Sequence, residues 1–299
     1  MLKVVTFMKQ VAMGLQMEGN FGTAHVYRSS LNAIIAYCGE EDLLFSEVTS
    51  EWLKGFEVYL RSRGCSWNTV STYLRTFRAV YNRAVDLRKA PYVPHLFRSV
   101  YTGTRADHKR ALCDDDMKKV FAKLSRTSGV PFAVCQAQEL FILMFSLRGM
   151  PFVDLAYLRK SDLRDNVITY RRRKTGQQLF IRWEKCMQEI LDKYPVNETE
   201  YLLPIITKRD EDYRKQYANE LHRVNHLLKK IGKQLDLSIP LTMYVGRHSW
   251  ASIAKSRNVP ISVISEGMGH DSENTTQIYL ASLDTSVVDR ANKKILDLL

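Results

Sequence analysis

The sequence has little cysteine and no metal-ligand pattern. Its 299 residues include an odd number of cysteines without a CxxC pair: Cys38, Cys65, Cys113, Cys135 and Cys186. This arrangement indicates neither a disulfide framework nor a zinc cluster, and it favours a reducing, cytoplasmic compartment. His222 and His226 have the i, i+4 spacing of a helical metal site, but no glutamate lies between them and no third ligand is evident. We therefore expect an ordinary helix face there and no metal.

Long apolar runs are also missing. No stretch approaches the roughly 20 consecutive apolar residues of a membrane-spanning helix, so no membrane partner is expected. Residues 1–15 slightly resemble a signal peptide, but Lys9 and Gln10 interrupt the apolar run and no small-residue cleavage site follows. A short amphipathic helix is the better interpretation of this stretch.

Acidic residues are fewer than basic ones. The chain has 32 Asp and Glu against 44 Lys and Arg, a net charge of +12. The first hundred residues hold 12 basic and 8 acidic residues, so they contribute +4 and the remainder contributes +8. The surplus is therefore not confined to one basic tail. It suits a polyanionic partner, either nucleic acid or an anionic membrane surface.

A polar, basic stretch divides the chain in two. Apolar residues at helical spacing predict short helices in the first part, at residues 23–37, 51–61 and 69–87. Pro91 and Pro94 end this helical material. We expect a helical domain over residues 1–101, a linker over 102–111 and a second domain over 112–299.

The second part combines helices with a small sheet. Its pattern predicts helices at residues 137–147, 184–193, 212–235, 245–256 and 261–268, and two or three short strands within 166–169, 170–174 and 178–183. The acidic run at 114–116 fits a helix N-terminus, where carboxylates complement the helix dipole. The predicted fold class is mainly α with a small antiparallel β-sheet (α+β).

The helix predicted at residues 69–87 mixes basic and aromatic side chains. It carries Arg75, Arg78 and Arg83 among Tyr73, Phe77 and Tyr81. Such a helix can lay its arginines along DNA phosphates while its rings pack inward. A solvated helix face over an ordinary core is an equally good interpretation of this segment alone.

Three segments of the second part carry the chemistry. Residues 268–272 read Met-Gly-His-Asp-Ser and residues 275–279 read Thr-Thr-Gln-Ile-Tyr; residues 241–252 read Leu-Thr-Met-Tyr-Val-Gly-Arg-His-Ser-Trp-Ala-Ser; residues 171–176 read Arg-Arg-Arg-Lys-Thr-Gly. They resemble, in that order, the glycine-histidine turn with the nucleophilic tyrosine, the helix with the second catalytic arginine, and the hairpin lysine of the tyrosine recombinase, or phage integrase, family. With the helical first domain, the resemblance covers nearly the whole chain.

The residue chemistry agrees with this resemblance. A protein hydroxyl can break a DNA phosphodiester without water and keep its energy in a reversible phosphotyrosine link, and Tyr279 is the expected nucleophile. The transition state needs positive charge and the departing 5′ oxygen needs an acid; Arg247 fits the first role and Lys174 the second. His270 can bind the phosphate or assist proton transfer from the phenol, whose ordinary pKa is about 10. No cofactor and no metal are expected.

Two family positions depart from the pattern. Tyr244 stands where the family commonly has a histidine; a phenol can donate a hydrogen bond to phosphate but is a poor base near neutral pH. The box that should hold the first arginine has Pro151 in its place. We expect Arg148, about one helical turn away, to supply that charge. The alternative is an arginine that only caps the preceding helix. Asp154 is the expected acidic support of the site.

Other residues near the boxes are given auxiliary roles. Arg171, Arg172 and Arg173 are expected to contact phosphates or solvent rather than to react, and Arg75, Arg78 and Arg83 are the corresponding candidates in the first domain. His248 and Trp250 are expected to shape the helix around Arg247 and its packing.

The resemblance implies a site-specific DNA recombinase that works through a 3′-phosphotyrosyl intermediate in inversion, excision or integration. It further implies a helical core DNA-binding domain and a catalytic domain that clamp duplex DNA, inverted-repeat core sites and a homotetramer on DNA. A C-terminal tail helix at residues 286–299 is expected to dock on a neighbouring subunit, and the alternative is that it packs against its own domain. Two alternatives stay open: a catalytically inactive DNA-binding relative, motivated by Pro151 and Tyr244, and a type IB topoisomerase-like enzyme.

Overall fold

The computed structural model describes residues 3–39, 43–105, 111–122 and 129–280. The chain separates into two compact units, Met1–Asp107 and His108–Leu299, which are taken one at a time. Within the described ranges, no helix is both long and apolar enough to cross a membrane. The tail helix predicted at residues 286–299 lies outside the described residues.

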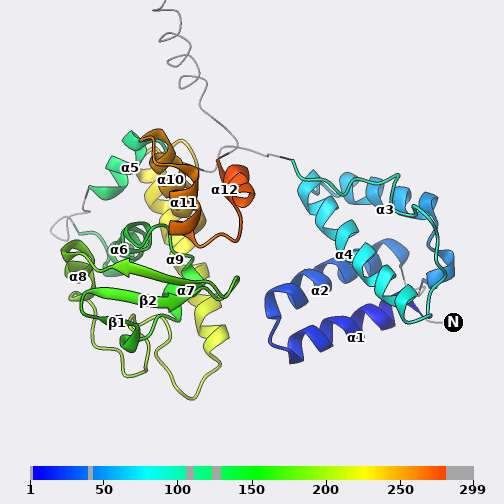
Figure 1. Ribbon diagram of the computed structural model, residues 1–299, viewed down its shortest axis with the longest axis horizontal. Helices are drawn as coiled ribbons and strands as arrows, with labels where there is room; N and C mark the ends of the chain where they lie inside the picture. Colours follow the sequence, from blue (N-terminus) through cyan, green and yellow to red (C-terminus); the bar gives the residue numbers. More distant parts are fainter. Residues whose placement is uncertain (1–2, 40–42, 106–110, 123–128, 281–299) are drawn as a thin grey trace, which may run out of the picture. The chain divides into compact units, whose positions relative to one another are not determined.

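The described part of the first unit consists mainly of helices. They are α1 (Val4–Met17), α2 (Phe21–Cys38), α3 (Ser50–Ser62) and α4 (Trp67–Asp86), labelled in Figure 1, with a short 3-10 turn, η1 (Phe45–Glu47). Hydroxyl caps begin two of them: Thr49 accepts a hydrogen bond from the N–H of Trp52 at 3.1 Å, and Ser66 accepts one from Thr69 at 3.2 Å. Aromatic side chains fill the space between the helices, among them the fully buried Phe45, Phe56 and Phe77.

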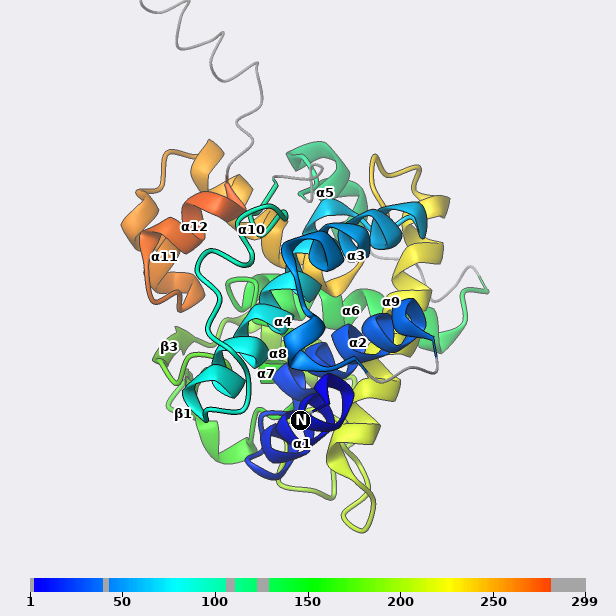
Figure 2. The ribbon, with the colours of Figure 1, turned by 90° about the vertical axis from the view of Figure 1, so that its right-hand side faces the viewer.

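In the second unit, helices cover one face of a small sheet (Figures 1 and 2). Its helices are α5 (Asp114–Phe121), α6 (Phe132–Ser146), α7 (Phe152–Ala156), α8 (Lys185–Leu191), α9 (Tyr213–Gln234), α10 (Met243–Ser256), α11 (Ile261–Met268) and α12 (Glu273–Tyr279), with a 3-10 turn, η3 (Lys160–Asp162). Its strands are β1 (Leu163–Arg164), β2 (Val167–Arg171) and β3 (Gln178–Arg182), antiparallel in the order β1-β2-β3.

Buried and less buried side chains alternate along β2 and β3, which shows the face of the sheet that packs against the core. Ile168 pairs with Ile181 and Tyr170 with Leu179, and all four side chains are buried. The residues between them point the other way, and Phe180 is 59% exposed. Successive side chains of a strand point to opposite faces, so the alternation carries on into the turn that joins β2 to β3.

The helix α6 is the centre of this unit. It packs against α8, α9 and α10, and its apolar residues extend around most of its circumference, as expected of a buried helix. Gly246 lets α10 approach it closely, because a Cβ at that position would lie 2.5 Å from Met144 Cε and 2.7 Å from Phe141 Cε2. The next residue, Arg247, is thereby brought to the edge of the core.

The predicted fold class is confirmed, and most helices lie within a few residues of their predicted bounds. The strands are the main correction. The two strands expected at 166–169 and 170–174 are one strand, β2, because its alternation continues through Thr169 and Tyr170 without a turn residue. The two-residue β1 and the five-residue α7 were not predicted, since neither is long enough to show a period.

Candidate active site

Arg247 is the centre of the site. It lies in the first turns of α10, where Thr242 caps the helix by accepting the N–H of Val245 at 3.3 Å. The residue is only 5% exposed. Its Nη1 donates to the carbonyl oxygen of Gly149 at 2.7 Å, and its Nη2 donates to that of Met268 at 2.9 Å. A buried guanidinium held in this way is a fixed positive charge.

The carbonyl of Gly149 reaches Arg247 because the chain turns tightly there. Gly149 has a φ of +67°, and a Cβ on it would lie 3.0 Å from the Cα of Arg247. Glycine adopts this left-handed conformation without a steric penalty and leaves room for the close approach. The turn that follows α6 is therefore built against the α10 arginine.

His270 is bound on both ring nitrogens. Its Nε2 lies 2.9 Å from Nη2 of Arg247, and its Nδ1 lies 2.8 Å from Oγ1 of Thr276. A guanidinium can only donate, so Nε2 accepts and Nδ1 carries the proton that it donates to Thr276. Burial, followed by the positive charge of Arg247, lowers the pKa of His270 from its ordinary 6.5 to about 4. His270 is therefore neutral near pH 7.

This state of His270 is a testable prediction. In ¹H–¹⁵N NMR spectra we expect the Nδ1–H tautomer and no titration between pH 5 and pH 8. A pKa lowered in the folded state favours the neutral ring, so this contribution to stability is complete above about pH 6.5 and is lost as the pH falls towards 4. The thermal midpoint should accordingly decrease over that window. A measured pKa of 6.5 or higher would contradict the arrangement described here.

The helix α12 carries Tyr279 as its last residue. It packs against α11 and α10 of the same unit, and Figures 1 and 2 both show the three helices together. Two residues fasten it there: Thr276 is fully buried against His270, and Leu280 is 4% exposed in a cluster with Ile264 and Met268. Arg247, His270 and the helix that bears Tyr279 thus belong to one packed assembly.

Arg172 is placed differently from the prediction. Contact with phosphates or solvent was expected, but the side chain is 6% exposed and faces inward. Its Nε donates to Oδ2 of Asp154 at 3.3 Å, and its Nη1 donates to the carbonyl oxygens of Met268 at 2.9 Å and Gly269 at 2.8 Å. The reason is the strand alternation: Ile168, Tyr170 and Arg172 share the core face of the hairpin.

Asp154 supports the site from α7. Its Oδ1 accepts the backbone N–H of Arg173 at 3.0 Å, while Oδ2 accepts Arg172. Burial raises the pKa of the Asp154 carboxyl, and the N–H of Arg173 and the charge of Arg172 act against that rise. The carboxyl group joins α7 to the β2–β3 turn.

Arg148 follows α6 in a left-handed conformation, with a φ of +58°. Backbone groups close the end of α6, where the N–H groups of Gly149 and Met150 donate to the carbonyls of Phe145 and Met144. Within the described part of the chain its guanidinium makes no hydrogen bond or ion pair. Its Cδ would be 3.7 Å from a Cβ on Gly267, so the side chain runs beside α11.

The charge of Arg148 is in the same cluster as the buried arginines. Burial raises the pKa of the Tyr170 phenol, and Arg172, Arg247 and Arg148 all act to lower it. Pro151 stands at the start of α7 with a φ of −58°, the residue type that begins helices readily. Arg148 thus lies within electrostatic reach of Tyr170, as Arg247 and Arg172 do, and Pro151 is a backbone element of the turn.

Lys174 lies in the exposed turn between β2 and β3. Its positive charge lowers the pKa of His270, so it stands within electrostatic reach of the histidine. The neighbouring Arg171 and Arg173 are exposed as well. The hairpin thus presents one lysine and two arginines beside the buried cluster.

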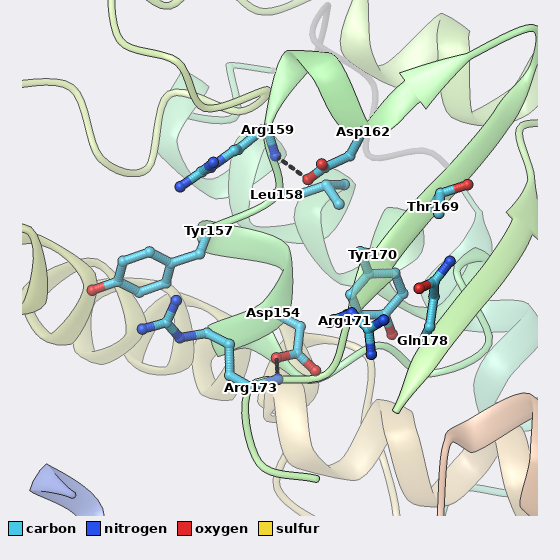
Figure 3. Close-up of a pocket in the computed structure, with 10 residues that line it drawn as sticks. All are labelled: Asp154, Tyr157, Leu158, Arg159, Asp162, Thr169, Tyr170, Arg171, Arg173 and Gln178. Atoms are coloured by element: carbon cyan, nitrogen blue, oxygen red, sulfur yellow. Dashed lines mark hydrogen bonds between the residues drawn. The ribbon is translucent and has the colours of Figure 1, made fainter. Parts of the chain in front are cut away.

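A polar hollow of about 450 Å³ lies next to this hairpin (Figure 3). Arg171 and Arg173 line it, together with Arg159 and Tyr157. The guanidinium carbon of Arg173 lies 4.0 Å from the centre of the Tyr157 ring, and Figure 3 shows it extended over that ring. Stacking of this kind orients an arginine without neutralising it.

Tyr244 and His248 occupy one face of α10. Tyr244 is 49% exposed, and its ring meets the edge of His248 with the centroids 4.4 Å apart and the planes at 76°. His248 is buried, in keeping with the expected packing role. Tyr244 lies in the first turn of α10, next to the capping Thr242.

The arginines predicted for the first unit lie on α4. Arg75 and Arg83 are exposed and Arg78 is half-buried, whereas Phe77 and Tyr81 are buried. The rings point inward and the arginines outward, the arrangement that both interpretations of this helix require.

Sequence reasoning missed three parts of the site. Thr276, which fixes the tautomer of His270, carries no signal beyond its position in the tyrosine box. The carbonyls of Gly149 and Met268 cannot be found from side-chain patterns at all. The inward direction of Arg172 depends on the register of β2, which three consecutive arginines conceal. In the described residues no cluster of three or more His, Cys, Asp or Glu is placed to hold a metal ion.

Comparison with known proteins matches both units. Residues 3–95 match the phage integrase SAM-like domain, and residues 133–286 match the phage integrase family. The chain is 23% identical over 273 residues to the tyrosine recombinase XerD of Listeria innocua, covering 86% of each chain. The chain belongs to the phage integrase family of tyrosine recombinases.

Solved structures agree with the fold. A lambda integrase dimer bound to a core site has a TM-score of 0.67 at 16% identity, covering 93% of this chain and 95% of that one. A lambda integrase tetramer bound to a Holliday junction has a TM-score of 0.66 at 17% identity, covering 93% of this chain and 77% of that one.

Proposed function

We propose that this chain is a site-specific DNA recombinase that cleaves and rejoins DNA through a 3′-phosphotyrosyl intermediate at Tyr279. The observation that carries the proposal is the packed assembly of Arg247, His270 and the Tyr279 helix within a family match that spans both units. Its fixed positive charge is what a pentavalent phosphorus transition state requires.

Each residue has a role in the proposed reaction. The Tyr279 oxygen attacks phosphorus and the bond to the 5′ oxygen breaks, leaving a 3′-phosphotyrosine and a free 5′-hydroxyl. Arg247 and Arg148 donate hydrogen bonds to the phosphoryl oxygens, and Lys174 gives a proton to the departing 5′ oxygen. The neutral His270 takes the phenol proton of Tyr279 on Nε2 once Arg247 turns to the phosphate, and the imidazolium that results donates a hydrogen bond to a phosphoryl oxygen. Tyr244 donates a hydrogen bond to the phosphate from α10.

The proposal assigns DNA contacts to both units. Arg171 and Arg173 meet the phosphates that flank the cleaved one, and Arg75, Arg78 and Arg83 of α4 meet those on the core site. Residues 1–101 act as the core-binding domain and residues 112–299 as the catalytic domain, joined by residues 102–111. The lambda tetramer on a Holliday junction supports a homotetramer on paired inverted-repeat sites. The site of action is the cytoplasm.

The acid role of Lys174 predicts a selective loss. Lys174→Ala should slow cleavage of ordinary DNA about 100-fold or more, the usual contribution of a general acid. DNA with sulfur at the bridging 5′ position should be cleaved at nearly the wild-type rate, because a thiolate leaves without protonation. Single-turnover assays measure both rates, and Lys185→Ala, on the exposed start of α8, serves as the matched control. Equal slowing on both substrates would assign Lys174 to binding instead.

The function itself is tested on a supercoiled plasmid. It should carry two copies of an inverted repeat taken from the DNA that flanks the gene, in a buffer with EDTA. We expect inversion or excision products, because arginine and lysine supply the charge that metal ions supply elsewhere. Relaxation without strand exchange would indicate a topoisomerase-like enzyme. Binding without any covalent adduct would indicate an inactive relative.

A further inference from the structure

Arg172 makes contacts that a DNA-binding arginine would not make. Its guanidinium is buried, and three of its hydrogen bonds are directed at the protein's own groups: Asp154, Met268 and Gly269. The backbone of Arg172 is fixed as well, since its N–H donates to Gln177 and its carbonyl accepts the N–H of Gly176, each at 2.8 Å. The backbone N–H and carbonyl of Arg172, and the Nε and Nη1 of its guanidinium, are thus all engaged within the protein.

The two carbonyls that Arg172 binds end α11. The C-terminus of a helix carries a partial negative charge, so a cation is stabilised there. Gly269 then turns the chain in the left-handed region, with a φ of +64°. A Cβ on Gly269 would lie 2.5 Å from Cδ of Arg172. The absence of a Cβ on Gly269 therefore makes room for the Arg172 side chain, and His270 is the next residue.

Two guanidiniums meet on one carbonyl oxygen. Met268 accepts Nη1 of Arg172 and Nη2 of Arg247, each at 2.9 Å. The same Nη2 of Arg247 reaches His270. The orientation of Arg247 and His270 is thus set jointly with that of Arg172, through the short turn at Met268 and Gly269.

Asp154 connects Arg172 to the segment in which Pro151 replaces the family's first arginine. The acidic residue belongs to the box whose arginine position is occupied by proline. In the structure its carboxyl group is taken up by Arg172 from the hairpin. Arg172 therefore balances the buried charge of Asp154, whose own segment supplies no arginine because Pro151 occupies that position.

We propose that Arg172 is a positioning residue: held by Asp154, it clamps the Met268–Gly269 turn and thereby sets His270 and Arg247 for phosphate binding. This inference rests on the proposed function. In this inference two residues replace the arginine that is missing at position 151. Arg172 pairs with Asp154, and Arg148 places positive charge at the phosphate. Arg172 itself does not touch the DNA.

Arg172→Lys and Arg172→Met test the clamp, with Arg182→Met, an 82% exposed side chain on β3, as the matched control. Single-turnover cleavage of a nicked duplex should fall about 100-fold or more in Arg172→Met, with DNA affinity within about 2-fold of wild type. Arg172→Lys keeps the charge but loses the fork, so its rate should be intermediate. In NMR spectra of both variants, the resonances of His270 should shift, which a merely structural role far from the ring would not cause.

A double variant separates positioning from folding. Asp154→Leu with Arg172→Met replaces the buried ion pair with an apolar pair, an exchange that proteins often tolerate. The thermal midpoint should recover relative to Arg172→Met, while cleavage should stay at least 100-fold below wild type. Recovery of both, or wild-type cleavage and an unchanged His270 in Arg172→Met, would overturn the proposal. If the wild type itself forms no adduct, the proposed function fails instead.

Discussion

Tyr279→Phe should abolish the covalent protein–DNA adduct while leaving DNA binding intact. The substitution removes one oxygen, and in the proposed reaction that oxygen is the only group that attacks phosphorus. The rest of α12 is fastened by Thr276 and Leu280, so the helix should stay docked. A duplex nicked near the cleavage site traps the intermediate, because the short fragment diffuses away and the reaction cannot reverse.

The readout is the fraction of protein that migrates with labelled DNA under denaturing conditions. We expect no detectable trapping for Tyr279→Phe, and wild-type trapping for Tyr92→Phe, a 77% exposed tyrosine of the first unit. Binding measured by gel shift should be equal for all three proteins. Persistent trapping by Tyr279→Phe would move the nucleophile to another residue.

Arg148→Ala should slow single-turnover cleavage about 100- to 1000-fold. Loss of one preorganised donor at a developing charge costs on the order of 3 to 4 kcal/mol, and Pro151 has no side chain that can replace it. The structure adds a second reason, because Arg148 has a φ of +58°. An ordinary residue in that region costs roughly 1 to 2 kcal/mol, and such strain is concentrated at functional sites.

The backbone conformation supplies its own control. Glycine adopts a positive φ freely, so Arg148→Gly should be more stable to unfolding than Arg148→Ala by about 1 kcal/mol. Both should nevertheless lose cleavage to a similar extent, and Arg148→Lys should recover only part of it. Near-wild-type rates in all three would make Arg148 a turn residue and leave the first-arginine role unfilled by this side chain.

Much of this fold could be predicted because its signals are local. The helix α11 occupies the predicted residues 261–268, since its apolar spacing is clear and Gly269 ends it. The boundaries of β2 were wrong because alternation shows that a strand is present but gives no sign where one strand stops and the next begins. The two-residue β1 forms only because β2 is there to pair with it.

The residues of the site could be predicted where the chemistry requires a particular residue type. The direction in which a side chain points could not be predicted, because it depends on the fold. Arg247, His270 and Tyr279 could be named from their motifs. Whether Arg172 pointed to DNA or to Asp154 depended on strand register, and three arginines in a row conceal that register. The bonds from Arg247 to the carbonyls of Gly149 and Met268 span 98 and 21 residues of the sequence, which no local pattern encodes.

The central claim is that Tyr279 links this protein to DNA, and the most direct test is the identity of the linked atoms. Wild-type protein is trapped on a nicked duplex in EDTA, digested with protease and nuclease, and sequenced by tandem mass spectrometry. The account predicts a nucleotide attached through a 3′-phosphate to Tyr279, and a free 5′-hydroxyl on the other DNA fragment. Attachment at any other residue, or through a 5′-phosphate, would contradict it.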